Sequence, residues 1–426
     1  MNIKGPKQQI LDVYLQNQLV GKLCSNNATL SFNYTSDYLK KFNSVKLSVA
    51  LPLQENTFDH QSTYAFFSGL LPDEGVRQRL AKHIGLSEKN IFALLKAIGG
   101  ECAGAVSVYS QGVSPILKGK AMYRILNDIE SDHILSALNK HPLLAGELDI
   151  RMSAAGAQDK LMIAFVNGQI GIPIKNSPST HIIKPEIKGL EASVQNEYFC
   201  MRLAKMLGLP VPEVEIYWLK EKPYYLIERY DRRQTKKGSI IRLHQEDFCQ
   251  ALHIPPEIKY ESEGGPTLAQ TFALLDNRIK LGFMEGKNKI ILLQGIIFNF
   301  LIGNGDAHAK NFSLLYSDNF ESLAPFYDLL STVIYSSPFK AKMAMQISGK
   351  YKFKEVCLRH WENLSSIIGF RPDFIKKQLI LLSQSIPEAA IALASELNQS
   401  PKTASPIYDK IIAVIFRNQK QLFANL

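Results

Sequence analysis

Residues 303–316, GNGDAHAKNFSLLY, place an aspartate, a histidine, a lysine and an asparagine within six positions, directly after the apolar run 290–302. Asp306 and Asn311 are five residues apart, and Asp328 follows in APFYDLL, seventeen residues after Asn311. Phosphoryl transfer from ATP needs one carboxylate to accept or orient the proton of the attacking hydroxyl, and an amide oxygen with a second carboxylate to hold Mg²⁺. The spacing therefore predicts Asp306 as the catalytic residue and Asn311 and Asp328 as the magnesium ligands.

The same Asp-to-Asn interval occurs in the catalytic loop of eukaryotic-type kinases, although Asn304 and Gly305 stand here in place of His-Arg. The pair alone is weak, because Asp and Asn are ordinary loop residues. Asp306 could instead cap a helix or lie in a turn, and His308 could be a satisfied histidine near the core. A hydrolase with Asp306 and His308 as metal ligands is another alternative, but no H-x-x-x-H or acidic partner motif supports it.

Three upstream features favour phosphoryl transfer. The segment SAAGAQDK (153–160) offers small residues whose backbone N–H groups can approach phosphate oxygens, although it matches neither G-x-G-x-x-G nor the Walker A pattern. Lys184 ends a short apolar segment, where a kinase places the lysine that meets the α- and β-phosphates. Glu228 and Tyr230, in YLIERYD, stand where a kinase hinge bonds the adenine. Along the chain, these features come in the order that the phosphoryl-transfer mechanism of a kinase requires: the small-residue loop, the lysine, the hinge, the Asp-Asn pair and the last aspartate.

Hydrophobic periodicity predicts the elements that must position these residues. Strands are predicted at 11–23 (two strands about Asn17), 27–35, 48–53, 161–166, 180–187, 214–219 and 223–231, with an Asn-Gly hairpin turn at 167–168. Helices are predicted within 62–98, 131–146 and 196–209, and then at 245–254, 267–279, 290–303, 373–386 and 389–397. The chain thus divides near residue 230 into an α/β half and a mostly helical half.

Composition narrows the class of protein. A chain of 426 residues with 46% hydrophobic and 21% charged residues can bury a large core and fits two or three domains. The start, MNIKGPKQQILDVYLQNQL (1–19), has no apolar leader region, and no apolar run is long enough to span a bilayer, so a cytoplasmic protein is expected. Five scattered cysteines without a C-x-x-C pair indicate neither a disulfide framework nor a cysteine zinc site. The net charge of +10 permits contact with nucleic acid or an acidic protein.

Over nearly its whole length the sequence resembles the HipA family of bacterial serine/threonine kinases, the toxins of HipBA toxin–antitoxin systems. The segments that carry the resemblance are GGECAGAV (99–106), SAAGAQDKL (153–161), HIIKP (181–185), NEYFCMRLAKMLGLPVPEVEI (196–216), ERYDR (228–232), RLHQEDFCQAL (242–252), YESEGGP (260–266), GNGDAHAKNFS (303–313) and PFYDLLS (325–331). Asp159 departs from the family pattern, in which Glu is common at that place.

The resemblance implies an α+β, bilobal protein-kinase-like fold. Its expected parts are an N-terminal subdomain (1–110), an N-lobe-like α/β region with the phosphate loop (111–230), and a helical C-lobe with the catalytic loop (231–426). ATP and Mg²⁺ are the expected cofactors. The residues expected at the nucleotide are Ala155, Gly156, Ala157, Gln158, Asp159, Lys160, Lys184, Glu228, Arg229, Tyr230, His308, Lys310 and Tyr327. Ser153 is the expected site of an inactivating autophosphorylation.

The family also implies partners. An aminoacyl-tRNA synthetase, notably the glutamyl enzyme, is the expected substrate, so that translation halts and growth arrest and persistence follow. A HipB-like helix-turn-helix antitoxin is the expected binding partner, with operator DNA bound mainly through it. Two alternatives stay open: a catalytically weak co-repressor, for which basic stretches such as DRRQTKK would suit phosphate contacts, and a small-molecule phosphotransferase.

Overall fold

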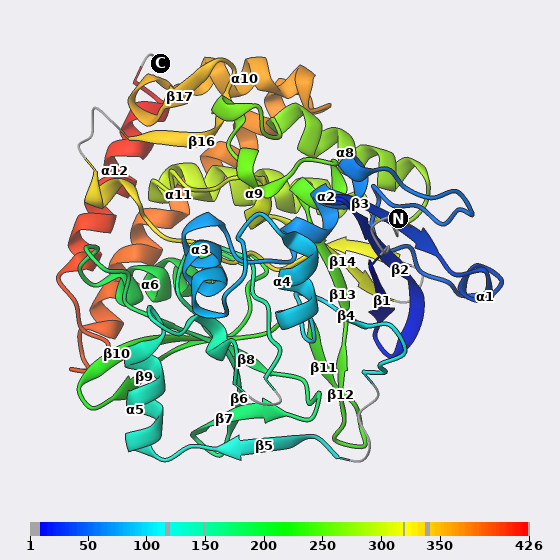
Figure 1. Cartoon of the computed structure of the whole chain (residues 1–426). Coiled ribbons are helices and arrows are strands. Elements are labelled where there is room, and N and C mark those ends of the chain that lie inside the picture. Colours follow the sequence, from blue (N-terminus) through cyan, green and yellow to red (C-terminus); the bar gives the residue numbers. More distant parts are fainter. Residues whose placement is uncertain (1–8, 116–119, 148–149, 318–319, 337–340, 425–426) are drawn as a thin grey trace, which may run out of the picture. The chain divides into compact units, whose positions relative to one another are not determined.

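The computed structural model describes residues 9–115, 120–147, 150–317, 320–336 and 341–424 (Figure 1). The chain forms two compact units, which we call unit 1 and unit 2. Unit 1 comprises Met1–Lys184, Glu228–Glu257 and Leu315–Asn319, and unit 2 comprises Pro185–Ile227, Ile258–Leu314 and Phe320–Leu426. The predicted α+β class is confirmed, while the three-part division at 110 and 230 stays a prediction. The expected lack of a leader concerns residues 1–19, of which 1–8 lie outside the described residues.

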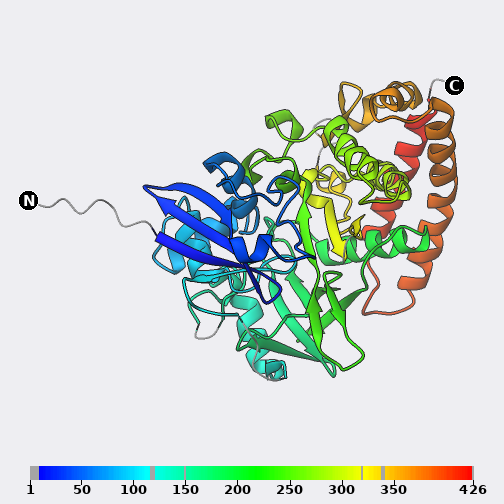
Figure 2. The ribbon, with the colours of Figure 1, turned by 90° about the vertical axis from the view of Figure 1, so that its right-hand side faces the viewer.

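Unit 1 begins with a four-stranded antiparallel sheet in the order β3-β2-β1-β4, whose first three strands are the blue arrows in Figure 2. Val13, Leu23 and Phe32 on this sheet are completely buried. Short helices lie between its third and fourth strands in the sequence. The elements are β1 Gln9–Leu15, β2 Gln18–Asn26, β3 Thr29–Tyr34, α1 Ser36–Leu39, α2 His60–Gly69, α3 Glu74–His83, α4 Ile91–Ile98 and β4 Val106–Ser110.

A second antiparallel sheet of unit 1 carries the strands around the predicted phosphate loop, in the order β5-β7-β6-β8. Asn167 and Gly168 both have positive φ, 49° and 81°, as a two-residue hairpin turn of type I′ requires, so the predicted turn is confirmed. The elements are β5 Met122–Ile125, α5 Asp128–Ala137, β6 Leu161–Val166, β7 Gln169–Ile174, β8 His181–Pro185, β11 Arg232–Gln234, β12 Ile240–Arg242, β13 His244–Asp247 and α7 Phe248–Ala251.

The strand predicted at 48–53 is wrong, because side chains rather than a neighbouring strand bind this backbone. The backbone N–H of Val49 donates to the carboxylate of Glu246 at 2.9 Å, and the hydroxyl of Ser48 donates to the same carboxylate. The N–H of Leu51 then closes a turn on the carbonyl of Ser48. Pro52 has no N–H to give to a sheet.

The helix predicted at 245–254 is also wrong in most of its length. Its first residues belong to β13, and α7 has only four residues. Asp247 begins α7 with a reciprocal capping box to Gln250. The chain then leaves the helix, and His253 has a positive φ of 59°. Apolar spacing alone did not reveal how short this helix is.

Unit 2 contains most of the long helices. Its elements are α6 Ser193–Met206, β9 Val214–Leu219, β10 Lys222–Glu228, α8 Leu268–Lys280, α9 Lys287–Ile302, β14 Ser313–Ser317, β15 Phe320–Leu323, β16 Lys342–Ile347, β17 Lys350–Lys352, α10 Leu358–Ile367, α11 Pro372–Leu397 and α12 Ile407–Leu422. The last residues of β10 and β14 belong to unit 1. Over the described ranges, each helix is too short or too polar to cross a bilayer.

The two helices predicted at 373–386 and 389–397 form one helix, α11, which continues through Pro387. A proline inside a helix leaves the carbonyl four residues earlier without its backbone partner. That carbonyl belongs to Ser383, and it accepts a hydrogen bond of 2.7 Å from the side-chain amide of Gln419 on α12. Figure 1 shows α11 and α12 in orange and red. The hydrogen bond from Gln419 therefore takes the place of the backbone bond that Pro387 cannot make. The helix continues where the sequence predicts a break between residues 386 and 389.

Candidate active site

The predicted catalytic loop begins where α9 ends. Gly303 has a φ of 72°, and its N–H and that of Asn304 bond back to the last turn of α9, at 3.1 and 2.8 Å. A Cβ atom on Gly303 would lie 2.4 Å from a methyl group of Val333. Both the left-handed backbone and the close contact require glycine here. The helix therefore stops at a fixed place, directly before Asp306.

Asn304 is the central residue of this loop. It is buried, and its Nδ2 donates to Oδ1 of Asn299 on α9 at 2.8 Å and to the backbone carbonyl of Asp328 at 3.2 Å. Its Oδ1 accepts from the backbone N–H of Asp306 at 3.1 Å. One amide thus connects the predicted catalytic aspartate to the predicted metal-binding aspartate. We expected no role for Asn304 from the sequence, where it was only a departure from the kinase pattern.

The side chain of Asp306 is half exposed, with 49% of its surface accessible. The hydroxyl of Tyr260 donates to its Oδ1 at 2.6 Å, and Nε2 of His308 lies 4.0 Å from the same oxygen. The side-chain amide of Asn311 donates to the backbone carbonyl of Asp306 at 2.9 Å. This bond directs the NH₂ group of Asn311 toward the loop, so that its Oδ1 is the atom suited to a hard cation.

Phe326 sets the position of the segment that carries Asp328. Its ring packs on Gly295 of α9, where a Cβ atom would lie 2.2 Å from the ring. The hydroxyl of Tyr327, the next residue, donates to the carbonyl of Lys310 at 2.7 Å. Asp328 itself has a left-handed backbone with a φ of 54°, a conformation that costs free energy in a residue other than glycine.

Unit 2 therefore brings together all of its predicted site residues, which are Asp306, His308, Lys310, Asn311, Tyr327 and Asp328. Among the described residues no group of three or more His, Cys, Asp or Glu side chains could hold a metal. An amide oxygen and one carboxylate suit Mg²⁺, which usually keeps waters and takes further oxygens from phosphates. The donors present thus fit a metal that binds together with a nucleotide.

The predicted phosphate loop lies in unit 1. Ser153 is completely buried, its N–H donates to the carbonyl of Glu101 at 2.8 Å, and its hydroxyl donates to the carbonyl of Leu70 at 2.6 Å. Gly156 has a φ of 111°, and a Cβ atom there would lie 2.5 Å from Nζ of Lys160. That ammonium group donates to the carbonyl of Ala155 at 2.7 Å. The loop is compact, and glycine is needed at its centre.

The other predicted residues of unit 1 differ in their surroundings. Lys184 on β8 is buried, whereas Glu228 is exposed. Asp159 forms an ion pair of 2.5 Å with Arg79, and the hydroxyl of Tyr230 donates to Gln245. Ala157, which is exposed, and Gln158, which is partly exposed, continue the loop after Gly156. A nucleotide contact for each of these residues, and for those named above, stays a prediction.

Arg229 belongs to a buried cluster that the sequence did not reveal. Its guanidinium binds Asp231 through two hydrogen bonds of 2.9 and 2.7 Å. Arg232 lies 3.0 Å from the same aspartate and 2.7 Å from Glu101. Glu101, Arg229, Asp231 and Arg232, which we call the ion-pair cluster, thus balance two positive and two negative charges. Burial raises the pKa of Glu101, but Arg232 and Arg229 outweigh it, and the net pKa is lowered.

The ion-pair cluster holds the segment Arg151–Met152, which leads into the phosphate loop and forms an isolated β-bridge with Glu101. Glu101 accepts the N–H of Ser153 and donates its own N–H to the carbonyl of Arg151 at 2.8 Å. Its carboxylate accepts the hydroxyl and N–H of Ser179 at 2.9 and 3.0 Å. In the sequence, the one signal for Glu101 is its place in the segment GGECAGAV. Tyr260, which bonds to Asp306 in unit 2, likewise lies in the segment YESEGGP, and the sequence gives it no role.

We expect Glu101→Gln to lower the free energy of unfolding by about 3 kcal/mol, because it leaves the two buried guanidinium groups of Arg229 and Arg232 with Asp231 as their one carboxylate in the ion-pair cluster. The loss should be largest above about pH 4.5, the range in which an unfolded glutamate is ionised and the lowered pKa stabilises the fold. Urea denaturation at several pH values measures it, with Glu55→Gln, an exposed glutamate of the same unit, as control. Equal stability of the two variants would contradict this role.

Known proteins resemble this chain along most of its length. Residues 11–109 match the HipA N-terminal domain, and residues 152–404 match the HipA-like C-terminal domain. Y4mE of Sinorhizobium fredii, which is named as a kinase, is 37% identical, over 89% of this chain and 91% of its own. The serine/threonine-protein kinase toxin HipA of Shewanella oneidensis is 28% identical, over 90% of this chain and 89% of its own.

The fold comparison agrees. A solved structure of Shewanella oneidensis HipA with HipB and operator DNA matches with a TM-score of 0.81 and 24% identity, covering 97% of both chains. The expected family is therefore confirmed by two domain matches and by relatives that span the chain. This chain belongs to the HipA family and is a kinase of that family.

Proposed function

We propose that this kinase is an ATP- and Mg²⁺-dependent serine/threonine protein kinase and the toxin of a toxin–antitoxin pair. The observation that carries the proposal is the network around Asn304, which ties Asp306 and Asp328 to the end of α9. The carboxylate of Asp306 is half exposed, as a group that meets a substrate must be. A protein that only binds its partners has no chemical need for this arrangement.

In the proposed reaction, a bond forms between the hydroxyl oxygen of a substrate serine or threonine and the γ-phosphorus, while the bond from this phosphorus to the ADP oxygen breaks. Asp306 accepts the hydroxyl proton. Asn311 and Asp328 offer oxygens to Mg²⁺, and Lys184 with the backbone of 155–160 binds phosphate oxygens. When bound, Mg²⁺ neutralises negative charge on the phosphates. Glu228, Arg229 and Tyr230 flank the adenine, and His308, Lys310 and Tyr327 lie near the nucleotide.

We further propose that phosphorylation of Ser153 switches the kinase off. The hydroxyl of Ser153 is buried and donates to the carbonyl of Leu70. A phosphoryl group would remove this donor and place a charge of nearly −2 against a carbonyl oxygen. The loop would then have to leave its place, and with it the backbone proposed to bind phosphates.

Ser153→Ala should therefore stay folded, at a cost of about 1 kcal/mol for one lost hydrogen bond, and keep its activity during prolonged incubation with ATP. The wild-type protein should lose activity as Ser153 is modified, and its residues 153–160 should exchange amide hydrogens faster. Time courses of turnover and hydrogen exchange measure both effects. Ser239→Ala, an exposed serine of unit 1, should behave like the wild type. Inactivation of Ser153→Ala at the wild-type rate would refute the switch.

The family membership also supports proposals about partners. An aminoacyl-tRNA synthetase, with the glutamyl enzyme first, is the proposed substrate, and inhibition of translation with growth arrest is the proposed outcome. A HipB-like antitoxin, and through it operator DNA, are the proposed binding partners, since the Shewanella oneidensis relative was solved with HipB and its operator. The proposed place of action is the cytoplasm.

The test is to incubate the purified chain with labelled ATP and Mg²⁺, alone, with purified glutamyl-tRNA synthetase and with cell lysate. Mass spectrometry should locate phosphate on Ser153 and on the synthetase, and chelation of Mg²⁺ should abolish both. Label on another lysate protein would redirect the substrate proposal only. Absence of protein label, with a small molecule phosphorylated instead, would overturn the protein-kinase proposal.

A further inference from the structure

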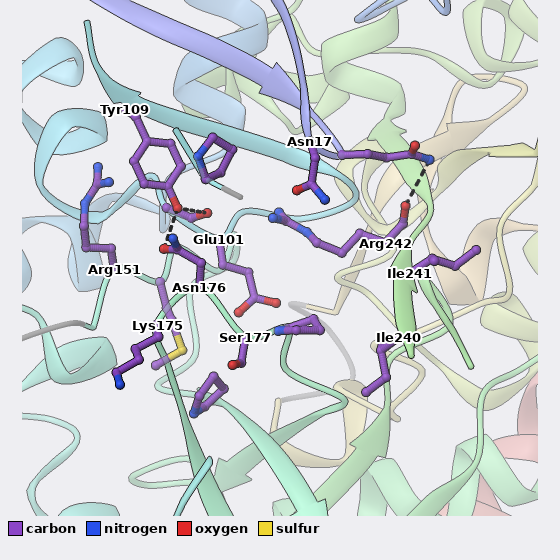
Figure 3. A pocket seen from close by; sticks show the side chains of 16 residues that line it. Asn17, Glu101, Tyr109, Arg151, Lys175, Asn176, Ser177, Ile240, Ile241 and Arg242 are labelled. Atoms are coloured by element: carbon purple, nitrogen blue, oxygen red, sulfur yellow. Dashed lines mark hydrogen bonds between the residues drawn. The ribbon is translucent and has the colours of Figure 1, made fainter. Parts of the chain in front are cut away.

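Unit 1 contains a cavity of about 380 Å³ beside the segment that precedes the phosphate loop (Figure 3). Pockets for small molecules typically start at about 300 Å³. Arg151 and Met152, the two residues before Ser153, line one side of it. Ile240 and Ile241 of β12, together with three prolines, supply apolar walls. The cavity is therefore large enough for a small organic molecule and offers it both polar and apolar surfaces.

The charged groups of the cavity are unbalanced. Arg151, Lys175 and Arg242 are positive, and Glu101 is the one acidic residue among those that line it. The charge of Glu101 is already matched by the two arginines of the ion-pair cluster. Within the described part of the chain, no carboxylate forms an ion pair with Arg151, Lys175 or Arg242.

The two arginines are held in place by hydrogen bonds to backbone carbonyl oxygens. The guanidinium of Arg151 donates to the carbonyl of Lys96 at 2.6 Å and lies 4.6 Å from the ring centre of Tyr109. The guanidinium of Arg242 donates to the carbonyl of Val106 at 2.6 Å. Carbonyl oxygens orient a guanidinium but carry no net charge, so both side chains keep their attraction for an anion.

Neutral donors lie beside these cations. The hydroxyl of Tyr109 donates to Oδ1 of Asn176 at 2.9 Å, which leaves the NH₂ group of this amide for a ligand. Figure 3 shows Tyr109, Asn176 and Arg242, from different elements, with their polar ends directed toward one another. Lys175 is exposed and lies beside Asn176 at the rim. Fixed guanidinium groups, an amide and a flexible ammonium group together match a doubly charged oxyanion.

We propose that this cavity binds a small organophosphate of the size of a sugar phosphate. A phosphate dianion fits three cations better than a single carboxylate does, and the remaining volume with its apolar walls accommodates an organic body. Bound ligand would contact Arg151 and so hold the segment that leads into Ser153. The binding itself does not depend on the proposed kinase function.

Isothermal titration of the full-length protein with ribose 5-phosphate tests this, in the presence of a saturating non-hydrolysable ATP analogue that occupies the nucleotide site. We expect binding of ribose 5-phosphate and none of ribose. Lys175→Glu should weaken the binding about tenfold, because the ligand loses one hydrogen bond to a charged group. Lys89→Glu, an exposed lysine of the same unit, carries the same charge change and should leave the affinity as it is.

Asn176→Asp is the second variant. It keeps the oxygen that accepts from Tyr109 but replaces the free NH₂ group by a negative oxygen, and it should weaken binding at least as much as Lys175→Glu. The proposal is overturned if ribose binds as well as its phosphate, if the ATP analogue displaces the ligand, or if Lys89→Glu weakens binding equally. It is also overturned if ribose 5-phosphate, glucose 6-phosphate and 3-phosphoglycerate all give no binding at millimolar concentrations.

Discussion

Asp306→Asn should reduce the rate of phosphoryl transfer by about 10²–10⁴-fold, the usual contribution of a positioned general base. An amide of the same shape cannot accept the proton of the attacking hydroxyl. Its oxygen can still accept the hydrogen bond that Tyr260 donates at 2.6 Å, so the loop should keep its structure. Turnover measured with labelled ATP should collapse, while nucleotide affinity measured by titration should change little.

Asp373→Asn is the matched control, because it removes the same charge from unit 2. Asp373 is exposed in the first turn of α11. The variant should turn over like the wild type. If Asp306→Asn were as active as Asp373→Asn, Asp306 would not be the catalytic residue. If it instead lost nucleotide affinity with unchanged turnover at saturation, its role would be in binding.

Asn304→Ala should produce the second large effect, a loss of about 10²-fold in turnover together with a destabilisation on the order of 3 kcal/mol. Three hydrogen bonds vanish, and the partly buried N–H of Asp306 and carbonyl of Asp328 each lose a partner. Because Asp328 is a proposed metal ligand, the Mg²⁺ concentration needed for half-maximal activity should also rise. Magnesium titrations of turnover and urea denaturation measure the two effects separately.

Asn363→Ala, an exposed asparagine on α10, is the control for removal of an amide from unit 2. It should change neither the turnover and its magnesium dependence nor the free energy of unfolding. An Asn304→Ala protein that is destabilised but keeps wild-type turnover and magnesium dependence would show that Asn304 only stabilises the fold. Asn304→Asp, which keeps the acceptor for the N–H of Asp306 and loses the donors, should fall between the two.

The sequence singles out candidate chemical residues more readily than the residues that hold them in place. Asp306, Asn311 and Asp328 form a recognisable set because phosphoryl transfer restricts residue type and spacing. Asn304 and Tyr260 act through hydrogen bonds within a fold, and many residue types can make such bonds. Their positions in the chain therefore carry no comparable signal, and their partners become clear only in the folded protein.

Secondary structure was predictable where local rules act alone, as in the turn at Asn167 and Gly168. The prediction failed where distant groups replace local bonds. Glu246 binds the backbone near Ser48, nearly two hundred residues away in the chain, and so prevents a strand there. Gln419 instead preserves the helix α11, because it donates a hydrogen bond to the carbonyl of Ser383, which has no backbone partner at Pro387.

This last bond has a consequence for the order of events during synthesis. Gln419 follows Ser383 by 36 residues, so the ribosome makes the whole of α11 before it makes the donor that α11 needs. Until α12 docks, the carbonyl of Ser383 must bond to water, and the helix is weakest at Pro387. We therefore expect the two parts of α11, before and after Pro387, to be joined less firmly in the nascent chain until α12 docks.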